Sequence, residues 1–351
     1  MEYQLNPKIA GLEPYEPISG EYRIRLDANE SYLPVPQEVR EKMAEAMGNL
    51  AFNRYPDPFC KDLCEAFASY YEISPDLVTA GNGSDELISI LMTAFLMKGE
   101  KILTIEPDFS MYRFYASLAE AECISLTKDT DLQINVDTVI EKSRQNAVRM
   151  VIFSNPCNPT GQGLSREEVR RLIASVDALV ILDEAYMDFW DQSLLQEVGQ
   201  YDNLVILRTC SKAVGSAAIR LGFAVANSTL TKAFRAVKSP YNVNAMTQRM
   251  GTYLFSCKKE MKNFQNQLLI SRDMLYNGIK TLESTHPGRL CVYPTCTNFV
   301  FLKTNEAKCI YDYFLKNGVA IRIMGEYLRI TAGDAQENNE VLRLLDEILK
   351  K

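Results

Sequence analysis

Between residues 77 and 226 the sequence alternates short apolar runs with segments of helical spacing. Six runs are short and rich in Val, Ile and Leu, as strands are: LVTA (77–80), KILTIE (101–106), MVIFSNP (150–156), ALVILDEA (178–185), NLVILRTC (203–210) and LGFAVA (221–226). Such runs, separated by helices, are typical of a mostly parallel sheet covered by helices on both faces. The pattern therefore predicts an α/β fold with a large domain built on this sheet.

The two ends of the chain have a different texture. The first 35 residues are rich in Pro, Glu and Tyr and show little periodicity, whereas the region after about residue 245 predicts a long helix (245–281) and then strands around a helix at 306–316. We expect an N-terminal arm that packs with the small domain and the active site, a large ligand-binding domain, and a small α+β C-terminal domain: 1–35, 36–244 and 245–351.

Composition excludes several classes of function. The net charge of −7 over 351 residues argues against nucleic acid or an anionic membrane as the main partner. Nine cysteines without a CxxC pair, and a single histidine (His286), make a metal site or a Ser-His-Asp triad improbable. The polar start of the sequence and the absence of a long apolar run predict a cytoplasmic protein.

Four stretches with chemical potential fall where strands end, the edge at which doubly wound sheets bind ligands. In TAGNGSDELI, Gly83 permits a tight turn, and Ser84 and Asp85 begin a helix whose free N–H groups suit a phosphate. The alternative is a tight turn with a helix cap. Glu86 stands where a dinucleotide-binding motif has its third glycine, which disfavours an NAD-type oxidoreductase.

The next two stretches are SNPCNPTG and LVILDEAYMDF. Two Asn-Pro pairs would hold the Asn158 amide on a rigid turn, although they are also compatible with a purely structural loop. Asp183 ends a buried strand, where a carboxylate is costly unless it meets a cation, and Tyr186 follows three residues later. The alternative for Asp183 is a helix cap.

The fourth stretch, TCSKAVGSAAIRLGF, surrounds Lys212 with small residues and adds Ser211 and Arg220. A solvated lysine in a loop is the alternative, but small neighbours would let a flat ligand approach closely. Together the four stretches suit one ligand with a protonated aromatic nitrogen, a phenolate, an aldehyde and a phosphate. Pyridoxal 5'-phosphate carries all four groups, and proteins that use it need a lysine and an acidic partner for its ring nitrogen.

The order GNGSDE, NPCNPTG, DEAYMDF, TCSKAVGSAAIRLG, PYNVN, TNFVF and LRITAG resembles fold-type I pyridoxal-phosphate aminotransferases. Within them it is most similar to the histidinol-phosphate aminotransferase group, over nearly the whole chain. The resemblance implies a ping-pong transaminase of amino-acid (histidine) biosynthesis, with histidinol phosphate and 2-oxoglutarate as the first guess for its substrates.

The resemblance also implies roles at the cofactor. Lys212 would bind the cofactor covalently and move a proton at the substrate Cα, Asp183 would pair with the ring nitrogen, and Asn158 and Tyr186 would bind the phenolic oxygen. Phe109 takes the position at which the family usually stacks a tyrosine on the ring. The phosphate would be held by Gly83, Ser84, Asp85, Ser211 and Arg220.

At the substrate end, Arg329 matches the arginine that binds the α-carboxylate, and Arg322 matches the one used for the far end of the substrate, often its phosphate. Tyr15, Asn29 and Asn242 are expected to line the same pocket. Tyr55 matches a tyrosine that reaches the phosphate of the neighbouring subunit's cofactor, which implies a homodimer with shared active sites. Its alternative is a tyrosine packed in a Pro-rich loop.

The sequence departs from the family pattern near the substrate. Arg322 and Arg329 are only seven residues apart, a shorter connection than is common, and DANESYLPVP replaces a more usual NPYGP-type run. Two other enzymes therefore stay open: an aromatic or broad-range aminotransferase, and a threonine-phosphate decarboxylase. A non-catalytic effector-binding module is the alternative from another class, although no basic DNA-binding segment is attached.

Overall fold

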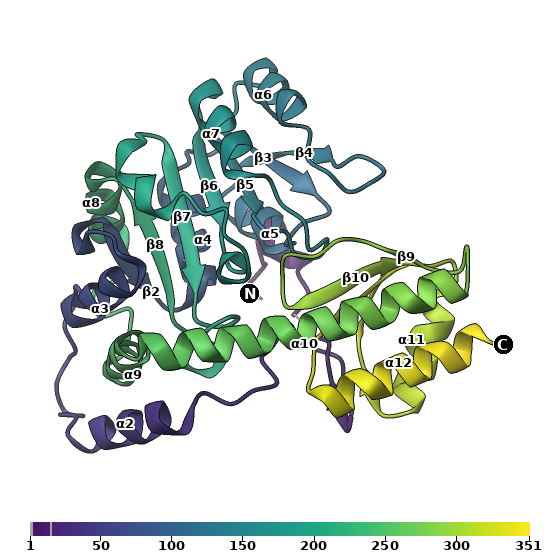
Figure 1. The fold of residues 1–351 in the computed structure, drawn as a ribbon. Coiled ribbons are helices and arrows are strands. Elements are labelled where there is room, and N and C mark those ends of the chain that lie inside the picture. The colour runs from purple at the N-terminus through teal and green to yellow at the C-terminus, as the bar shows by residue number, and fades with distance from the viewer. Residues whose placement is uncertain (1–2, 15) are drawn as a thin grey trace.

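A computed structural model describes residues 3–14 and 16–351. Its large sheet has the strand order β2-β8-β7-β6-β5-β3-β4, in which β8 runs antiparallel to both neighbours and the other pairs are parallel (Figure 1). The strands are β2 (Val78–Gly81), β3 (Lys101–Glu106), β4 (Glu122–Thr127), β5 (Met150–Ser154), β6 (Leu179–Asp183), β7 (Leu204–Thr209) and β8 (Gly222–Ala226). The six predicted strands are confirmed. The edge strand β4 was not predicted, because its partly exposed residues form no apolar run.

Helices cover both faces of this sheet, as the side chains of β6 show. Val180 and Leu182 belong to one hydrophobic core, and Ile181 between them belongs to the other. Side chains alternate across a strand, so both faces are buried. The surrounding helices are α3 (Lys61–Tyr71), α4 (Gly83–Ala94), α5 (Met111–Leu118), α6 (Val136–Gln145), α7 (Arg166–Ser175) and α8 (Ser228–Val237), with the short 3-10 helices η1 (Pro75–Leu77), η2 (Met187–Phe189), η3 (Leu195–Gln200) and η4 (Ala217–Ile219).

The C-terminal region forms a smaller α+β unit around a four-stranded antiparallel sheet of order β12-β13-β10-β9. Its elements are β9 (Cys291–Val292), β10 (Phe299–Lys303), α11 (Ala307–Lys316), β12 (Arg322–Met324), β13 (Tyr327–Thr331) and α12 (Ala335–Leu349). The predicted fold class, a large parallel-sheet domain with a smaller α+β domain, is thereby confirmed.

The single helix expected over 245–281 is two helices, α9 (Ala245–Ser256) and α10 (Lys258–Thr285), with Cys257 between them. Phe264 in the first half of α10 packs in the large-domain core, whereas Leu275 and Ile279 pack in the small-domain core. The helix α10 therefore runs across both units, as Figure 1 shows. The boundary after residue 244 stays a prediction.

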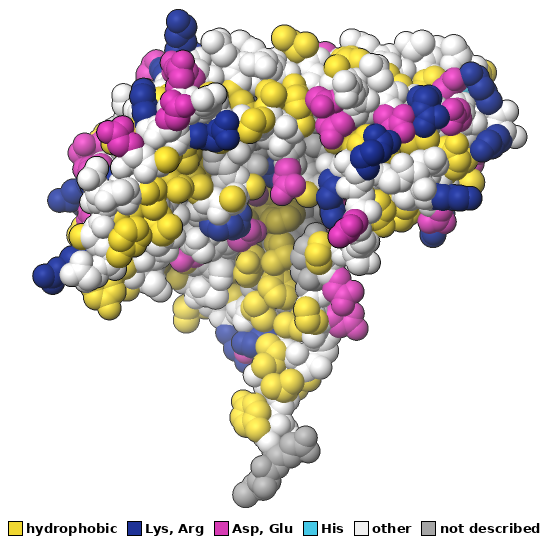
Figure 2. Space-filling model, turned by 90° about the horizontal axis from the view of Figure 1, so that it is seen from below, with side chains coloured by type: hydrophobic (Ala, Val, Ile, Leu, Met, Phe, Trp, Pro, Cys, Tyr) yellow, Lys and Arg dark blue, Asp and Glu magenta, His cyan; other side chains and the backbone are white. Residues whose placement is uncertain are grey.

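The N-terminal segment contains α1 (Pro7–Ala10) and β1 (Ile24–Arg25) and leads into α2 (Gln37–Gly48). Strand β1 pairs in parallel with β11 (Val319–Ala320) of the small unit, which ties the segment there. Figure 2 shows the chain next to the grey end projecting from the body, with hydrophobic side chains along it. Tyr3, Leu5 and Leu12 of this segment are exposed. Tyr15 lies outside the described residues.

The described residues show neither a membrane-spanning helix nor a metal-binding cluster. None of the helices there combines the length and the apolar character needed to cross a membrane. No group of three or more His, Cys, Asp or Glu side chains in the same part of the chain is arranged to hold a metal ion.

Candidate active site

The candidate residues gather at the carboxyl ends of the central strands. Asp183 is the last residue of β6, Asn158 follows β5 by four residues, and Lys212 follows β7 by three. These strands are neighbours in the sheet, so their ends meet at one edge. The sheet thus brings together three side chains, the first and last of which are 54 residues apart in the sequence.

The surroundings of Lys212 lower the pKa of its amine. Its Nζ donates a hydrogen bond to the carbonyl oxygen of Ala28, 3.0 Å away, and lies 5.8 Å from the centre of the Tyr186 ring. Removal of the amine from water and, second, the positive charge of Arg329 lower the pKa of Lys212 to about 8. A minor fraction of the amine, larger than in an ordinary lysine, is therefore uncharged and nucleophilic at neutral pH.

Asp183 is a buried carboxylate, 4% exposed. Its Oδ2 accepts a hydrogen bond from the Tyr112 hydroxyl at 2.8 Å, and its Oδ1 accepts one from the Ala185 backbone N–H at 3.1 Å. Burial raises the pKa of Asp183 to about 7, against the lowering effect of the Tyr112 hydrogen bond. A cation at this position would be strongly favoured, because it would stabilise the charged form that burial disfavours.

The substrate side of the site joins all three parts of the chain. Arg329 on β13 donates to the Asn158 side-chain oxygen and to the carbonyl oxygen of Asp27, the second at 2.7 Å. Asn29 donates to the Tyr186 hydroxyl at 2.8 Å, and its backbone N–H donates to Thr331. Burial raises the pKa of Tyr186 to about 12, so its hydroxyl keeps a proton that it can donate.

At the other end of the edge, the first turn of α4 meets Arg220. Gly83 has a left-handed backbone (φ +81), and a Cβ added there would lie 2.8 Å from the Arg220 side chain. A Cβ on Gly222 would lie 2.5 Å from the backbone nitrogen of Ser84, so the turn tolerates no bulk on either side. Arg220 forms an ion pair with Asp85 at 3.2 Å. The helix N-terminus and the guanidinium together suit an anion such as a phosphate.

Three other predicted residues lie around this edge. Phe109 precedes α5 and is half-buried, with its ring edge-on to Tyr112 at 5.6 Å between centroids. The Ser211 hydroxyl accepts a hydrogen bond from Thr209 at 3.1 Å. Asn242 donates to Glu86 and to the carbonyl oxygen of Ala80, which places it beside the start of α4 rather than with Arg329.

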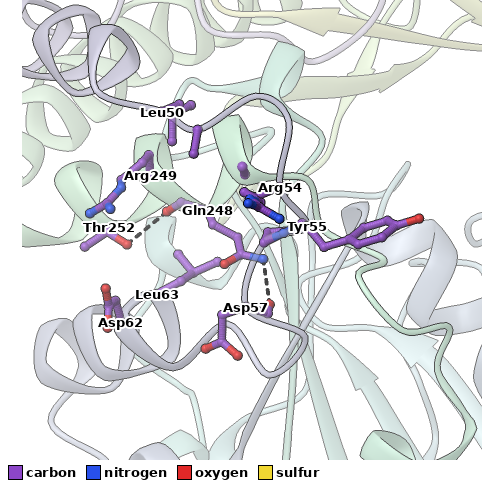
Figure 3. Close-up of a pocket in the computed structure, with 12 residues that line it drawn as sticks. Leu50, Arg54, Tyr55, Asp57, Asp62, Leu63, Gln248, Arg249 and Thr252 are labelled. Carbon is purple, nitrogen blue, oxygen red and sulfur yellow. Dashed lines mark hydrogen bonds between the residues drawn. The ribbon is translucent and has the colours of Figure 1, made fainter.

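Tyr55 lies on the surface of the chain. It is 81% exposed and stacks on Tyr241, with 4.6 Å between ring centroids. Figure 3 shows its ring directed away from the other labelled residues of a cavity of about 220 Å³, which includes Arg54, Asp57 and Gln248. This exposure does not match a tyrosine packed inside a loop, and the contact of Tyr55 with a neighbouring subunit stays a prediction.

Sequence reasoning missed two supporting groups. Tyr112, which holds Asp183, carries no signal beyond its place one helical turn after Phe109. Arg208 forms buried ion pairs with Glu184 at 2.8 Å and Asp188 at 2.7 Å, directly under the segment that carries Asp183 and Tyr186. Its signal was present, because an arginine inside the apolar run NLVILRTC needs a buried acidic partner.

The groups present fit pyridoxal 5'-phosphate. A reactive amine, a buried carboxylate suited to a cation and an anion-binding helix start lie along one edge of the sheet. A sheet covered by helices on both faces, with these groups at one edge, is typical of the fold-type I pyridoxal-phosphate enzymes. The chain belongs to the family of class I and II aminotransferases, whose model matches residues 22–345.

Individual relatives agree with that assignment. The chain is 37% identical to a histidinol-phosphate aminotransferase from Clostridium kluyveri over 96% of both sequences. In fold it is similar to the histidinol-phosphate aminotransferase from Sinorhizobium meliloti in complex with pyridoxal-5'-phosphate (TM-score 0.89, 21% identity, 100% of this chain and 98% of that one). It is also similar to L-threonine-O-3-phosphate decarboxylase from Porphyromonas gingivalis (TM-score 0.79, 21% identity, 93% and 100%). The predictions of an aminotransferase and of pyridoxal 5'-phosphate as its cofactor are confirmed.

Proposed function

We propose that this aminotransferase moves an amino group between histidinol phosphate and 2-oxoglutarate in two successive half-reactions. The observation that carries the proposal is the pairing of Arg322 with Arg329, directly opposite each other on β12 and β13. Residues in register on antiparallel strands project to the same face, so the two guanidiniums are available to one ligand on that face of the small sheet. Such a pair suits substrates that carry a phosphate or two carboxylates. The curated relative from Clostridium kluyveri supports the same substrate.

The proposed cofactor residues take the roles that their positions suggest. Asp183 would hold the ring nitrogen, Asn158 and Tyr186 the phenolic oxygen, and Phe109 the face of the ring. The phosphate would be bound by Gly83, Ser84, Asp85, Ser211 and Arg220. When bound, the cofactor supplies an electron-accepting ring that stabilises negative charge at the substrate Cα.

Lys212 is the proposed catalytic base. With its pKa lowered to about 8, its amine would take a proton from the substrate Cα and return it to the cofactor carbon that carries the aldehyde group. Arg329 would bind an α-carboxylate, Arg322 the far anionic group, and Asn29 would border the pocket, whereas Asn242 lies beside the start of α4 and is not proposed for the pocket. Tyr15, proposed for the same pocket, lies outside the described residues.

The substrate is tested by a panel of amino donors assayed with 2-oxoglutarate. Histidinol phosphate should exceed phenylalanine and aspartate in kcat/KM. Equal rates for all three would refute the substrate assignment and favour a broad-range aminotransferase. The fold similarity to a threonine-phosphate decarboxylase makes a second candidate, and release of carbon dioxide from threonine phosphate, without formation of glutamate, would identify it. Histidinol phosphate has no α-carboxylate and cannot give that result.

We also propose a homodimer that shares its active sites through Tyr55. Tyr55 stacks on Tyr241, and Phe52, Phe59 and Met246, which are near them in the sequence, are exposed as well. Exposed aromatic residues gathered in this way are typical of protein interfaces. Light scattering should give twice the mass of the chain. A Tyr55→Phe variant should keep that mass and bind the cofactor less tightly, and a monomeric wild-type protein would refute the proposal.

A further inference from the structure

A lysine and a cysteine are buried in contact beside the turn that carries Asn158. Lys128 directly follows β4, and Cys157 immediately precedes Asn158. The Nζ atom of Lys128 lies 2.8 Å from the Cys157 sulfur and 2.8 Å from the carbonyl oxygen of Pro107. Lys128 is 6% exposed and Cys157 is fully buried. Lysines are rarely buried to this extent, and the proposed transamination uses neither side chain.

The charges around the pair keep Lys128 protonated, and its nitrogen stays in contact with the sulfur. Burial lowers the pKa of Lys128, but the Cys157 sulfur and, after it, the Asp108 carboxylate raise that pKa by more, so the amine keeps its proton. The Lys128 nitrogen and the Cys157 sulfur lie 2.8 Å apart, so the two atoms are already placed for a bond between them. The contact is therefore a place where a buried thiol can react selectively.

A cavity gives small molecules a route to the pair. It has a volume of about 490 Å³ and lies between the large sheet and the small sheet. Pro107, Lys128 and Pro159 form one side, and Phe301, Met324 and Tyr327 form the other. Peroxide is far smaller than this cavity and can reach the lysine. Cys157 itself does not line the cavity, but its sulfur contacts Lys128, which does.

We propose that Lys128 and Cys157 form a redox-sensitive site, at which a peroxide drives formation of a covalent S–N bond between the two side chains. In the first step the sulfur attacks one peroxide oxygen, the O–O bond breaks and one water leaves. The sulfur is oxidised by two electrons and the peroxide is reduced. In the second step the lysine nitrogen attacks the sulfur, the S–O bond breaks and a second water leaves. The net change is one hydrogen lost from the thiol and one from the amine.

The first step prepares the second. Oxidation changes the Cys157 sulfur, whose contact contributes most to raising the pKa of Lys128. Burial then favours the neutral amine, the form that attacks sulfur. The link also removes the positive charge that lies near Asp108. Asp108 accepts hydrogen bonds from the backbone N–H groups of Ser154 and Phe109, and Phe109 is proposed to lie against the cofactor ring, so a change at Asp108 would reach the cofactor site. We therefore expect a several-fold loss of affinity for pyridoxal phosphate after oxidation.

The test treats the purified holoprotein with hydrogen peroxide and maps its peptides by mass spectrometry. The two exposed thiols are first removed as Cys291→Ser and Cys309→Ser, because they would form disulfides between molecules. The expected product joins the peptides of Lys128 and Cys157, is two hydrogens lighter than their sum, resists trypsin at Lys128 and is reversed by a thiol reductant. Cys157 found oxidised with Lys128 unlinked would overturn the proposal.

Cys210 is an internal control for selectivity. It is as buried as Cys157, and burial raises the pKa of its thiol far above the usual range. Cys210 should therefore stay reduced under conditions that link Cys157, and equal oxidation of both would contradict a special role for Lys128.

Two variants separate the steps. Cys157→Ser should abolish both the link and the peroxide-dependent loss of cofactor affinity. Lys128→Arg keeps a cation without a primary amine, so Cys157 should be oxidised and trapped by a sulfenic-acid reagent, without a link. The exposed Lys98→Arg is the matched control and should behave as the parent. A link that forms in Lys128→Arg would refute the assignment of Lys128, and peptide mapping of the parent decides the question if a variant fails to fold.

Discussion

Arg322 and Arg329 are cross-strand partners, in register on β12 and β13. Like charges directly opposite each other on antiparallel strands destabilise the pair. Arg329 is held by Asn158 and by the carbonyl oxygen of Asp27, so its position is fixed before any substrate arrives. The short connection that the sequence shows between the two arginines is thus a tight hairpin that brings two positive charges to one face. We therefore expect an anionic substrate to relieve the repulsion between the two arginines.

Arg322→Ala should weaken the use of phosphate-bearing donors while leaving the fold intact. Loss of a hydrogen bond to a charged group costs about 1.5–3 kcal/mol, which corresponds to roughly a 10- to 100-fold lower kcat/KM. Relief of the repulsion should leave the free energy of unfolding unchanged or raise it by about 0.2–1 kcal/mol. Steady-state kinetics and urea unfolding measure the two effects. Lys303→Ala, which removes a cation paired with Glu326, is the control. Unchanged kinetics with histidinol phosphate would remove Arg322 from the site.

Lys212 should react with pyridoxal phosphate in a pH-dependent manner. Its pKa is lowered to about 8, so the uncharged amine dominates above that pH and the protonated amine dominates below it. The rate of covalent cofactor uptake by the cofactor-free protein, trapped by borohydride, should rise through about pH 8 and then level. Lys212→Ala should trap no cofactor. Arg329→Gln removes one of the charges that lower the pKa, so the midpoint should move to higher pH. A midpoint near that of an ordinary lysine would contradict the desolvated environment of the amine.

Much of this site could be predicted from the sequence, because its main residues are fixed by local signals. Asp183 ends an apolar strand, and Lys212 follows one amid small residues, so neighbouring parallel strands bring them together. The contact of Tyr112 with Asp183 could not be predicted, since it depends on how α5 packs against β6. The facing of Arg322 and Arg329 depends on strand register, which a turn of two residues can shift. The edge strand β4, which leads to Lys128, has no apolar run to reveal it.

Tyr112→Phe tests whether the hydroxyl supports Asp183. The hydrogen bond favours the charged carboxylate, which is the form that would pair with the ring nitrogen of the cofactor. Its loss should weaken cofactor binding by about 1–2 kcal/mol, or roughly 5- to 30-fold. Absorbance titration of the cofactor-free protein gives the dissociation constant. Tyr276→Phe, on α10 in the small-domain core, should leave it unchanged. An equal effect in both variants would mean that general loss of stability, rather than support of Asp183, is responsible.

Arg208→Met should destabilise the protein much more than the loss of a surface cation. Arg208 is buried between Glu184 and Asp188, and its guanidinium lies 5.1 Å from the centre of the Tyr71 ring. Removing one partner of a buried charge cluster leaves the other charges buried without a counter-charge, at a cost of about 3–5 kcal/mol in the free energy of unfolding.

The control for Arg208 is Arg113→Met, which removes a partly exposed pair with Glu106 and should cost less than about 1 kcal/mol. Adding Glu184→Gln to Arg208→Met should recover part of the loss, because it removes one of the carboxylates left without a cation. Urea unfolding of the cofactor-free proteins measures all three. If the double variant were no more stable than Arg208→Met alone, the loss would come from packing around Tyr71 rather than from the buried charge, and Arg208 would support the segment carrying Asp183 by its shape instead.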